Sequence, residues 1–460
     1  MYTSESETIA AISTAVSNSG IGIIRMSGDE AFEIIKKIFV PAKGGEIDIS
    51  ESHKVHYGNI VDGNSIADEA LVLIMKAPHT YTREDVVEID CHGGAYVMKK
   101  VLDIVLKNGA RAAEPGEFTK RAFMNGRIDL AQSEAVTDII NAENDYALKS
   151  AVTQLKGSVS EKIKAQRAIL LEQIAYIEAA LDDPEHIEMD GYGDELLPIL
   201  ENCRKEIKKL VDTADDGRII TEGIRTVILG KPNVGKSSLL NALLGQERAI
   251  VTDIAGTTRD ALEEKLRIGD LVLNIVDTAG IRNTEDVIEK IGVEKAKEYA
   301  ADADLILYVA DTSRELDDED LEIIDIIKDK KAIVILNKQD LEKKIDEEQL
   351  KKLLNCKIIE TSVKEGTGLE QLNETIKDMF FGKAIDFNDQ VYITNARQKA
   401  ALIAAEKSLE KAVESIENGM PEDFFTIDMM AAFENLGLVI GEAIEDDLAD
   451  EIFSKFCMGK

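Results

Sequence analysis

The sequence has few cysteines and no long apolar run. It contains four cysteines in 460 residues. None of them forms a C-x-x-C pair or a zinc-ligand spacing, so we expect a reducing compartment and no disulfide framework. The stretch from Met1 to Glu5 lacks the basic and apolar parts of a secretory signal. No segment approaches the roughly 18 apolar residues that suggest a membrane-spanning helix. We therefore expect a soluble, cytoplasmic protein without a membrane partner.

Basic residues are also scarce. The chain carries 54 Lys and Arg against 88 Asp and Glu, a formal net charge of −34. A chain this acidic is a poor general binder of nucleic acid, so any RNA contact must come from a local basic surface. From Arg121 to Arg167 there are seven basic and six acidic residues. This stretch is a candidate docking surface, although a solvated helix face explains the same pattern.

One stretch carries specific chemistry. Gly230 to Ser237 reads G-x-x-x-x-G-K-S, between an apolar strand pattern at 226–229 and an amphipathic helix pattern at 238–244. This is the context of a phosphate-binding loop. Its glycines let backbone N–H groups turn toward phosphates, and the helix N-terminus adds partial positive charge. We expect Lys236 to reach the β- and γ-phosphates and the Ser237 hydroxyl to bind Mg²⁺.

Two motifs that would contact the metal and the γ-phosphate follow the loop. Thr258, in the run Gly256 to Asp260, is expected to complete the Mg²⁺ coordination. Asp277-Thr278-Ala279-Gly280 follows the strand pattern at 271–276. Asp277 would hold the metal through water, and the Gly280 N–H would meet the γ-phosphate.

Two further motifs predict that the base is guanine. Asp340, in Asn337-Lys338-Gln339-Asp340, can accept both N–H donors of guanine, a pair that adenine lacks. Ser362-Val363-Lys364 follows another strand pattern and would close over the base. Together these motifs predict a GTP-binding domain. The residues expected around GTP are Asn233, Val234, Gly235, Lys236, Ser237, Ser238, Thr252, Asp253, Ile254, Ala255, Gly256, Thr257, Thr258, Asp277, Thr278, Ala279, Gly280, Asn337, Lys338, Asp340, Ser362, Val363 and Lys364.

The motifs leave the hydrolytic group open. Small signalling GTPases place a water-orienting glutamine directly after the Asp-x-x-Gly glycine, but Ile281 stands there. The acidic residues nearby are Glu285, Asp286 and Glu289, and the nearby arginines are Arg259 and Arg282. Asn233 offers a neutral oxygen beside the phosphates, where a monovalent cation could supply the missing charge.

The apolar periodicity predicts three domains. Residues 1–119 alternate strand patterns, at 22–27, 70–75 and 86–91, with helix patterns at 29–39 and 96–108, which indicates an α+β domain. Residues 120–217 and 384–460 have helical spacing with few glycines or prolines. Residues 218–383 contain the nucleotide motifs. We expect an all-α domain interrupted by an inserted α/β P-loop domain of the Ras-like type.

Beyond the nucleotide motifs, the chain resembles the MnmE (TrmE) family of tRNA-modification GTPases along essentially its whole length. The stretches that carry the resemblance are 22–25, 88–94, Pro115 to Phe123, Asp129 to Gln132, Thr252 to Asp260 and Phe456 to Lys460. The resemblance implies that the protein acts with the flavoprotein MnmG on the wobble uridine of certain tRNAs. There it would add an aminomethyl-type group, such as carboxymethylaminomethyl, at C5.

The resemblance also implies ligands and a homodimer formed through the N-terminal domain. Arg25, Glu88, Arg127 and Lys460 match the family's positions for 5-formyltetrahydrofolate or a related reduced folate, with Arg127 where some members have lysine. The G domains of the family dimerise across K⁺. Asn233 matches its side-chain ligand, and Thr252, Ile254 and Thr257 lie on the surrounding switch loop. Glu289 matches the residue that positions the attacking water, and Cys457 the C-terminal cysteine, a possible nucleophile.

Two segments depart from the family pattern. Thr14 to Gly20 replaces the family's Thr-Pro-Pro-Gly, and Arg83-Glu84-Asp85 replaces its Gly-Glu-Asp. An alternative interpretation is a ribosome- or RNA-assembly GTPase without covalent chemistry, whose G domain could look much the same. The features that distinguish the two are Arg25, Glu88 and the Cys457 tail, which an assembly factor does not need.

Overall fold

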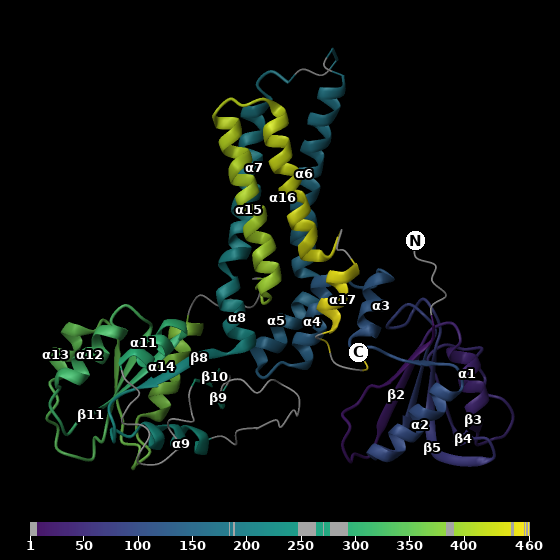
Figure 1. Ribbon diagram of the computed structural model, residues 1–460, viewed down its shortest axis with the longest axis horizontal. Helices are drawn as coiled ribbons and strands as arrows, with labels where there is room; N and C mark the ends of the chain where they lie inside the picture. Colours follow the sequence, from purple (N-terminus) through teal and green to yellow (C-terminus); the bar gives the residue numbers. More distant parts are fainter. Residues whose placement is uncertain are drawn as a thin grey trace. The chain divides into compact units, whose positions relative to one another are not determined.

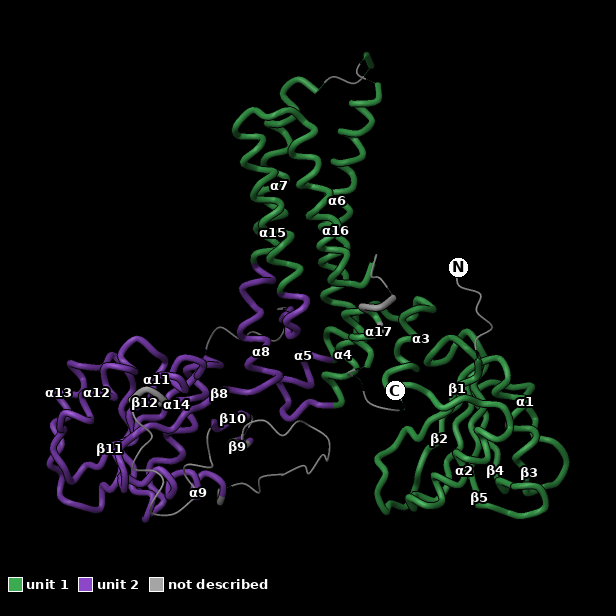
Figure 2. The backbone as a smooth tube through the Cα atoms, viewed as in Figure 1, with its two compact units in different colours: residues 1–140, 152–208, 400–460 green, residues 141–151, 209–399 purple. Residues whose placement is uncertain are grey.

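The computed structural model describes residues 7–183, 185–186, 189–246, 264–269, 271–276, 293–382, 391–442, 446–454, 456 and 459. The chain divides into two compact units (Figure 2). The first comprises residues 1–140, 152–208 and 400–460, and the second residues 141–151 and 209–399. Within the described residues, no helix combines the length and the apolar character needed to cross a membrane.

The first unit begins with a seven-stranded sheet of order β3-β4-β5-β6-β2-β1-β7. Its strands are β1 (Ile9–Ile12), β2 (Gly22–Ser27), β3 (Phe39–Pro41), β4 (Lys54–Asp62), β5 (Ser65–Met75), β6 (Val86–Cys91) and β7 (Arg111–Ala112). Neighbouring strands are antiparallel except β1 and β7. The strands predicted at 22–27, 70–75 and 86–91 are confirmed. Sequence analysis missed β4, where Val55 and Tyr57 are exposed and blur the usual alternation.

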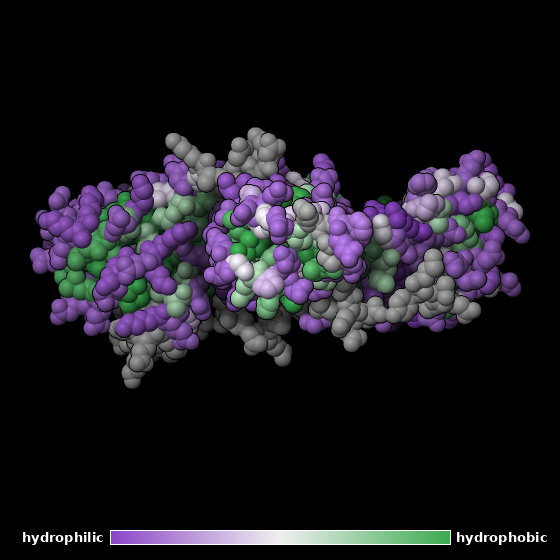
Figure 3. Space-filling model, turned by 90° about the horizontal axis from the view of Figure 1, so that it is seen from above, coloured by the Kyte–Doolittle hydropathy of each residue, from purple (hydrophilic) through white to green (hydrophobic). Residues whose placement is uncertain are grey.

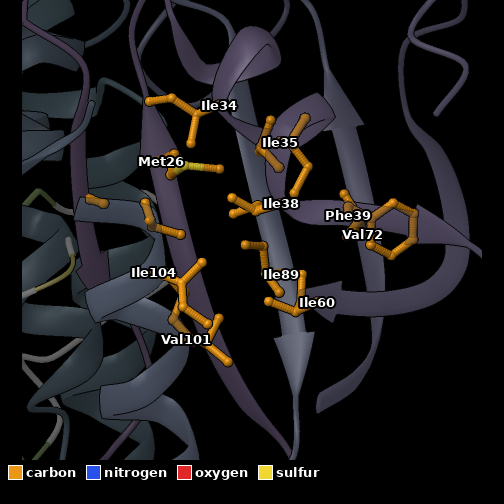
Figure 4. Close-up of a cluster of buried hydrophobic side chains, with 14 of the residues drawn as sticks. Met26, Ile34, Ile35, Ile38, Phe39, Ile60, Val72, Ile89, Val101 and Ile104 are labelled. Carbon is orange, nitrogen blue, oxygen red and sulfur yellow. The ribbon is translucent and has the colours of Figure 1, made fainter. Parts of the chain in front are cut away.

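Two helices share one core with this sheet, as predicted for 29–39 and 96–108. They are α1 (Ala31–Ile38) and α2 (Ala95–Lys107). Figure 4 shows their apolar side chains meeting those of the strands. The side chains labelled there include Met26, Ile34, Ile35, Ile38, Ile89, Val101 and Ile104, all at most 1% exposed. The α+β prediction for this part of the chain is confirmed.

Helices make up the rest of the first unit. Four long ones, α6 (Ser158–Asp182), α7 (Tyr192–Asp212), α15 (Ala396–Glu417) and α16 (Glu422–Ile440), lie side by side as a bundle (Figure 1). The shorter ones are α3 (Glu117–Met124), α4 (Leu130–Ile140) and α17 (Asp446–Ser454), whereas α5 (Asp145–Leu155) lies mostly in the second unit. The predicted helical spacing is borne out on α6, where Ile163, Leu170, Ile174 and Ile177 are buried. An ion pair between Arg204 and Glu410 joins α7 to α15.

The second unit is built on a six-stranded sheet of order β13-β12-β11-β8-β10-β9. The strands are β8 (Ile224–Leu229), β9 (Glu264–Ile268), β10 (Leu271–Ile275), β11 (Leu305–Asp311), β12 (Ala332–Asn337) and β13 (Lys357–Glu360). Its helices after β8 are α9 (Lys236–Gln246), α11 (Val293–Asp302), α12 (Asp318–Ile327), α13 (Glu347–Leu353) and α14 (Leu369–Phe381). Only β9 pairs antiparallel with its neighbour. This is the predicted α/β arrangement.

The second unit extends beyond the predicted inserted domain. Helix α8 (Ala214–Glu222) leads into β8, and the Arg218 guanidinium pairs with Asp304 at 2.5 Å, next to β11. The ring of Tyr146 on α5 stacks on that of Phe381, with centroids 5.5 Å apart. The division into residues 1–119, 120–217 with 384–460, and 218–383 therefore remains a prediction.

Polar residues cover much of the surface, as the charge of the chain leads one to expect. On the face drawn in Figure 3, hydrophilic residues predominate and apolar ones form smaller patches between them. Among the exposed apolar side chains are Phe424 and Ile427 on α16. Such scattered exposure is ordinary for a folded protein and by itself indicates no site.

Candidate functional sites

The loop between β8 and α9 has the backbone that a phosphate-binding loop needs. Gly230 has φ +145°, and a Cβ there would lie 2.3 Å from the Val309 carbonyl oxygen. Gly235 has φ +106°, and a Cβ there would lie 2.2 Å from Asn337 Nδ2. Asn233 is also left-handed, with φ +61°. The glycines of the motif are thus required by conformation and by close approach.

Lys236 lies within this loop as predicted. Its Nζ donates to the carbonyl oxygens of Gly230, at 2.6 Å, and Lys231, at 2.7 Å. Burial lowers the pKa of Lys236 to about 8. A phosphate group beside this ammonium would favour its charged form, because opposite charges stabilise each other strongly away from water. Ser237 and Ser238 follow it in the first turn of α9.

The other lysine of the motif has a different position. Lys231 Nζ pairs with Asp317, the N-cap residue of α12, and lies 3.2 Å from Asp320. The side chain of Lys231 therefore ties the loop to α12. Only Lys236 points into the loop.

Asn337 joins the phosphate loop to the predicted base-binding segments. Its side chain is buried, and Nδ2 donates to the Val234 carbonyl oxygen at 2.9 Å. Its Oδ1 accepts from the Val363 N–H at 3.3 Å and from Thr361 Oγ1 at 3.4 Å. Three segments that are far apart in the sequence thus meet at one amide, which sequence analysis placed only as a contact to the nucleotide.

Asp340 and the 362–364 segment, both expected around the guanine base, contact each other. Ser362 Oγ donates to Asp340 Oδ1 at 3.0 Å, and Lys364 Nζ lies 3.9 Å from Asp340 Oδ2. The Asp340 side chain is 17% exposed, so a carboxylate acceptor is held in a partly desolvated position, as recognition of the two guanine donors requires. Lys338 has φ +68°, and its Nζ donates to Asp311 Oδ2 at 2.7 Å.

The remaining predicted nucleotide and metal residues lie outside the described residues. They are Thr252, Asp253, Ile254, Ala255, Gly256, Thr257, Thr258, Asp277, Thr278, Ala279, Gly280 and Glu289. The same holds for Cys457 and Lys460 near the C-terminus.

A second candidate site lies in the first unit. Arg25 on β2 and Glu88 on β6 are direct partners in the sheet register, and Arg25 Nε donates to Glu88 Oε1 at 2.7 Å. Their side chains are 17% and 18% exposed. The Arg25 guanidinium lies 5.5 Å from the Tyr81 ring centroid and 5.7 Å from that of Phe118. Arg127 lies over the same Tyr81 ring at 4.7 Å. Three of the four predicted folate residues are therefore close to one another.

The C-terminal segment reaches the same place. The Gly459 carbonyl oxygen accepts from Ser13 Oγ at 2.9 Å and from Arg25 Nη1 at 3.4 Å. Gly459 has φ +82°, and a Cβ there would lie 2.4 Å from the Ile12 carbonyl oxygen. Sequence analysis missed Tyr81 and Gly459. Only the glycine carries a signal, since a left-handed turn beside a close backbone favours that residue.

A network of charged side chains supports this site, and sequence analysis missed it. Glu117 accepts from Arg111 Nη2 at 2.7 Å and from Arg121 Nη2 at 3.0 Å, and Arg121 also binds Glu84 at 3.0 Å. Burial alone would raise the pKa of Glu117, but the hydrogen bonds from Arg111, the Glu114 N–H and Arg121 hold that pKa below its usual value. Glu84 also accepts from Ser27 Oγ at 2.7 Å, at the end of β2. The network fixes β2 relative to α3.

Comparison with known proteins covers almost the whole chain. Residues 8–127 match the family model described as "GTP-binding protein TrmE N-terminus", and residues 130–457 match that of the "MnmE helical domain". A protein of Lachnoclostridium phytofermentans named tRNA modification GTPase MnmE is 56% identical over 99% of this chain and 100% of its own length. Proteins of the same name from Thermoanaerobacter pseudethanolicus and Clostridioides difficile are 52% and 49% identical, each over 99% of both chains. With a helical-domain match over most of its length and full-length relatives at this identity, the chain belongs to the MnmE (TrmE) family of tRNA modification GTPases.

Proposed function

We propose that this protein hydrolyses GTP to drive modification of certain tRNAs together with the flavoprotein MnmG. The modification adds a carboxymethylaminomethyl-type group to C5 of the wobble uridine and takes its one-carbon unit from a reduced folate. One observation carries the proposal: Arg25 pairs with Glu88, and Arg25 and Arg127 both lie over the Tyr81 ring, in a chain that also holds a guanine-nucleotide site. An assembly GTPase without covalent chemistry does not need the cluster of Arg25, Glu88 and Arg127.

The residues of the first-unit site suit 5-formyltetrahydrofolate. A carboxylate such as Glu88 can accept from the N–H donors of a pterin ring, and the nearby Tyr81 ring, which is partly exposed, offers a flat apolar contact. The guanidinium of Arg127 and the ammonium of Lys460 can pair with the carboxylates of the glutamate tail. The folate, when bound, supplies the one-carbon unit. Cys457 is a candidate nucleophile toward the uridine ring.

The residues of the second unit suit GTP with Mg²⁺. Lys236 is buried in the loop where the phosphates bind, and Ser237 and Thr258 are proposed to bind the metal ion, with Asp277 behind a water. Asp340 accepts from guanine. We propose that Asn233, with Thr252, Ile254 and Thr257 around it, holds K⁺ and that Glu289 positions the attacking water.

We further propose that the protein works as a cytoplasmic homodimer of three-domain chains. The N-terminal domain would form the constant contact, and the G domains would associate across K⁺ during turnover. The dimer would bind MnmG as a larger complex. This arrangement links GTP hydrolysis in the second unit to chemistry on the tRNA elsewhere.

A reconstituted reaction tests the proposal. Wild type, Lys236→Ala and Arg25→Met are each mixed with MnmG, GTP, Mg²⁺, 5-formyltetrahydrofolate, an amine and a tRNA carrying an unmodified wobble uridine, in KCl or NaCl. The product is measured by mass spectrometry of the nucleosides, and GTP turnover is measured in parallel. We expect product only with wild type in KCl. Arg25→Met should keep GTP turnover and lose product. Product formation without folate or with Arg25→Met would contradict the folate assignment.

A further inference from the structure

Asp311 is a buried carboxylate at the edge of the nucleotide site that sequence analysis did not single out. It is the last residue of β11, and it pairs in register with Asn337, the last residue of β12. Because the two strands are parallel, their carboxyl ends meet at one edge of the sheet, where the turn that carries Lys338 and Asp340 begins. The Asp311 side chain is only 3% exposed. An ionised group buried to this extent needs partners.

The two oxygens of this carboxylate have different partners. Asp311 Oδ1 accepts from the backbone N–H of Ser313 at 2.9 Å and from its hydroxyl at 2.7 Å, which closes a tight local turn. Oδ2 accepts from Lys338 Nζ at 2.7 Å, and the more exposed Arg314 guanidinium lies 3.7 Å away. Burial alone would raise the pKa of Asp311, but the hydrogen bonds from Lys338 and Ser313 hold that pKa below its usual value. An asparagine could serve the local turn equally well, so the negative charge serves the cations, of which Lys338 is the nearer.

Lys338 itself has an unfavourable backbone conformation. Its φ of +68° is left-handed, which disfavours a residue with a Cβ, and strain of this kind is concentrated at functional sites. Backbone hydrogen bonds fix the turn, from the Thr312 N–H to the Asn337 carbonyl oxygen at 3.0 Å and from the Leu341 N–H to the Lys338 carbonyl oxygen at 2.9 Å. The backbone of Lys338 is therefore fixed, but its flexible four-carbon stem can direct the ammonium to more than one carboxylate.

The carboxylate within this turn is Asp340, the proposed acceptor for guanine. That role requires lone pairs that are free to meet the two guanine donors. Ser362 Oγ already donates to Asp340 Oδ1 at 3.0 Å, whereas the exposed Lys364 ammonium stays 3.9 Å from Oδ2. An ammonium bound directly to Asp340 would occupy the oxygens that guanine needs. The bond from Lys338 to Asp311 keeps the ammonium of this turn on a different carboxylate.

We propose that Asp311 is a positioning residue for guanine recognition, which binds the Lys338 ammonium and so keeps the Asp340 carboxylate available to the base. The inference rests on the proposed function, since it takes Asp340 as the guanine acceptor. It adds a residue that sets how strongly the site prefers guanine. Without the charge of Asp311, the Lys338 ammonium turns to Asp340 and competes with the base.

The test compares the binding of GDP and of IDP, whose base lacks the 2-amino group of guanine, to the full chain by calorimetry. Wild type should prefer GDP by at least about tenfold, because IDP offers one donor fewer to the carboxylate. Asp311→Asn keeps the shape of the side chain and the acceptor for Ser313, so it should fold. We expect its preference to fall to within about threefold, through weaker binding of GDP. At saturating GTP, kcat should equal that of wild type, while KM for GTP rises.

A second variant removes the competing cation. Asp311→Asn combined with Lys338→Met loses the ammonium but keeps an unbranched stem, so the preference for GDP should return to that of wild type. Asp325→Asn is the matched control. Asp325 on α12 pairs with Lys328 at 2.7 Å, and both side chains are exposed, so its replacement should leave the preference unchanged.

Two results would overturn the inference. If Asp311→Asn weakens GDP and IDP equally, or neither of them, Asp311 does not act on the base acceptor. If the double variant keeps the low preference of Asp311→Asn, the Lys338 ammonium is not the competitor. If wild type itself does not prefer GDP to IDP, the proposed role of Asp340 fails as well.

Discussion

The two candidate sites differ in how their residues are distributed along the sequence. The phosphate loop is one stretch, Gly230 to Ser237, and the base-binding residues lie in two more short stretches, 337–340 and 362–364. The first-unit site draws single residues from separate segments: Arg25, Tyr81, Glu88, Phe118, Arg127 and Gly459. A loop whose function lies in its own backbone can be recognised from consecutive residues. A site assembled by a sheet and by the end of the chain cannot.

The largest effect that would test this comparison is expected at Lys236. Replacing Lys236 with Ala should lower GTP turnover by about 10²- to 10³-fold, because a preorganised charge beside the developing negative charge is lost. Phosphate release at saturating GTP measures it. Since the phosphate loop acts as a local unit, hydrogen exchange in the strands outside the loop should change little.

Lys231→Ala is the control within the same motif. The Lys231 side chain pairs with Asp317 and Asp320 instead of entering the loop, so turnover should change by less than about fivefold. If Lys231→Ala were as inactive as Lys236→Ala, GTP hydrolysis would also depend on the contact between the loop and α12. The function of the site would then not lie in residues 230–237 alone.

More of the site in the second unit than of the site in the first unit can be predicted from the sequence, and the reason is physical. The run of Gly, Lys and Ser in the loop follows from the needs of phosphate binding, and each strand pattern there ends at a motif. The same local rules give the helices over 31–38 and 95–107. They do not give the pairing of Arg25 with Glu88, which depends on the β2–β6 register, or the place of Gly459, which depends on contacts with Ser13 and Arg25. Those folate positions come from family resemblance alone.

Asn337 shows the same limit inside the nucleotide site. Its motif marks it as a contact to GTP, but nothing in the sequence indicates that its amide binds Val234 and Val363 as well. Tertiary contacts of this kind depend on how parallel strands bring separate loops to one edge of a sheet. The two sites therefore differ only in how much of each can be predicted from consecutive residues.

A smaller effect is expected at the first-unit site, where binding and stability are not separable. Glu88→Ala leaves Arg25, 17% exposed, without its carboxylate. The local free energy of unfolding should fall by about 1–3 kcal/mol, between the values for exposed and buried ion pairs. Hydrogen exchange of peptides covering β2 and β6 measures it, because a chain of several domains gives no single unfolding transition.

Asp62→Ala supplies the matched comparison for Glu88→Ala. Asp62 pairs with Lys100 at 2.8 Å, and both side chains are 38% exposed, so solvent screens the pair and Asp62→Ala should lose less protection than Glu88→Ala. Equal protection in β2 and β6 for Glu88→Ala and wild type would show that the pair serves ligand binding alone. In both sites, a residue needed for ligand binding could then be replaced without a loss of stability.

The smallest effect concerns the pH dependence of nucleotide binding. Burial lowers the pKa of Lys236 to about 8 in the free loop, and a bound diphosphate, which favours the ammonium, must raise it. Binding therefore takes up a proton above pH 8. The Kd for GDP should be constant below that pH and rise about tenfold for each unit above it, until the pKa of the bound state is reached.

Calorimetry in buffers of different ionisation enthalpy should detect the proton uptake. Lys236→Arg keeps its charge throughout and should bind with a flat profile. A flat profile in the wild type would mean that the lysine is already fully charged in the free loop, so that its carbonyl contacts compensate for burial before any phosphate arrives.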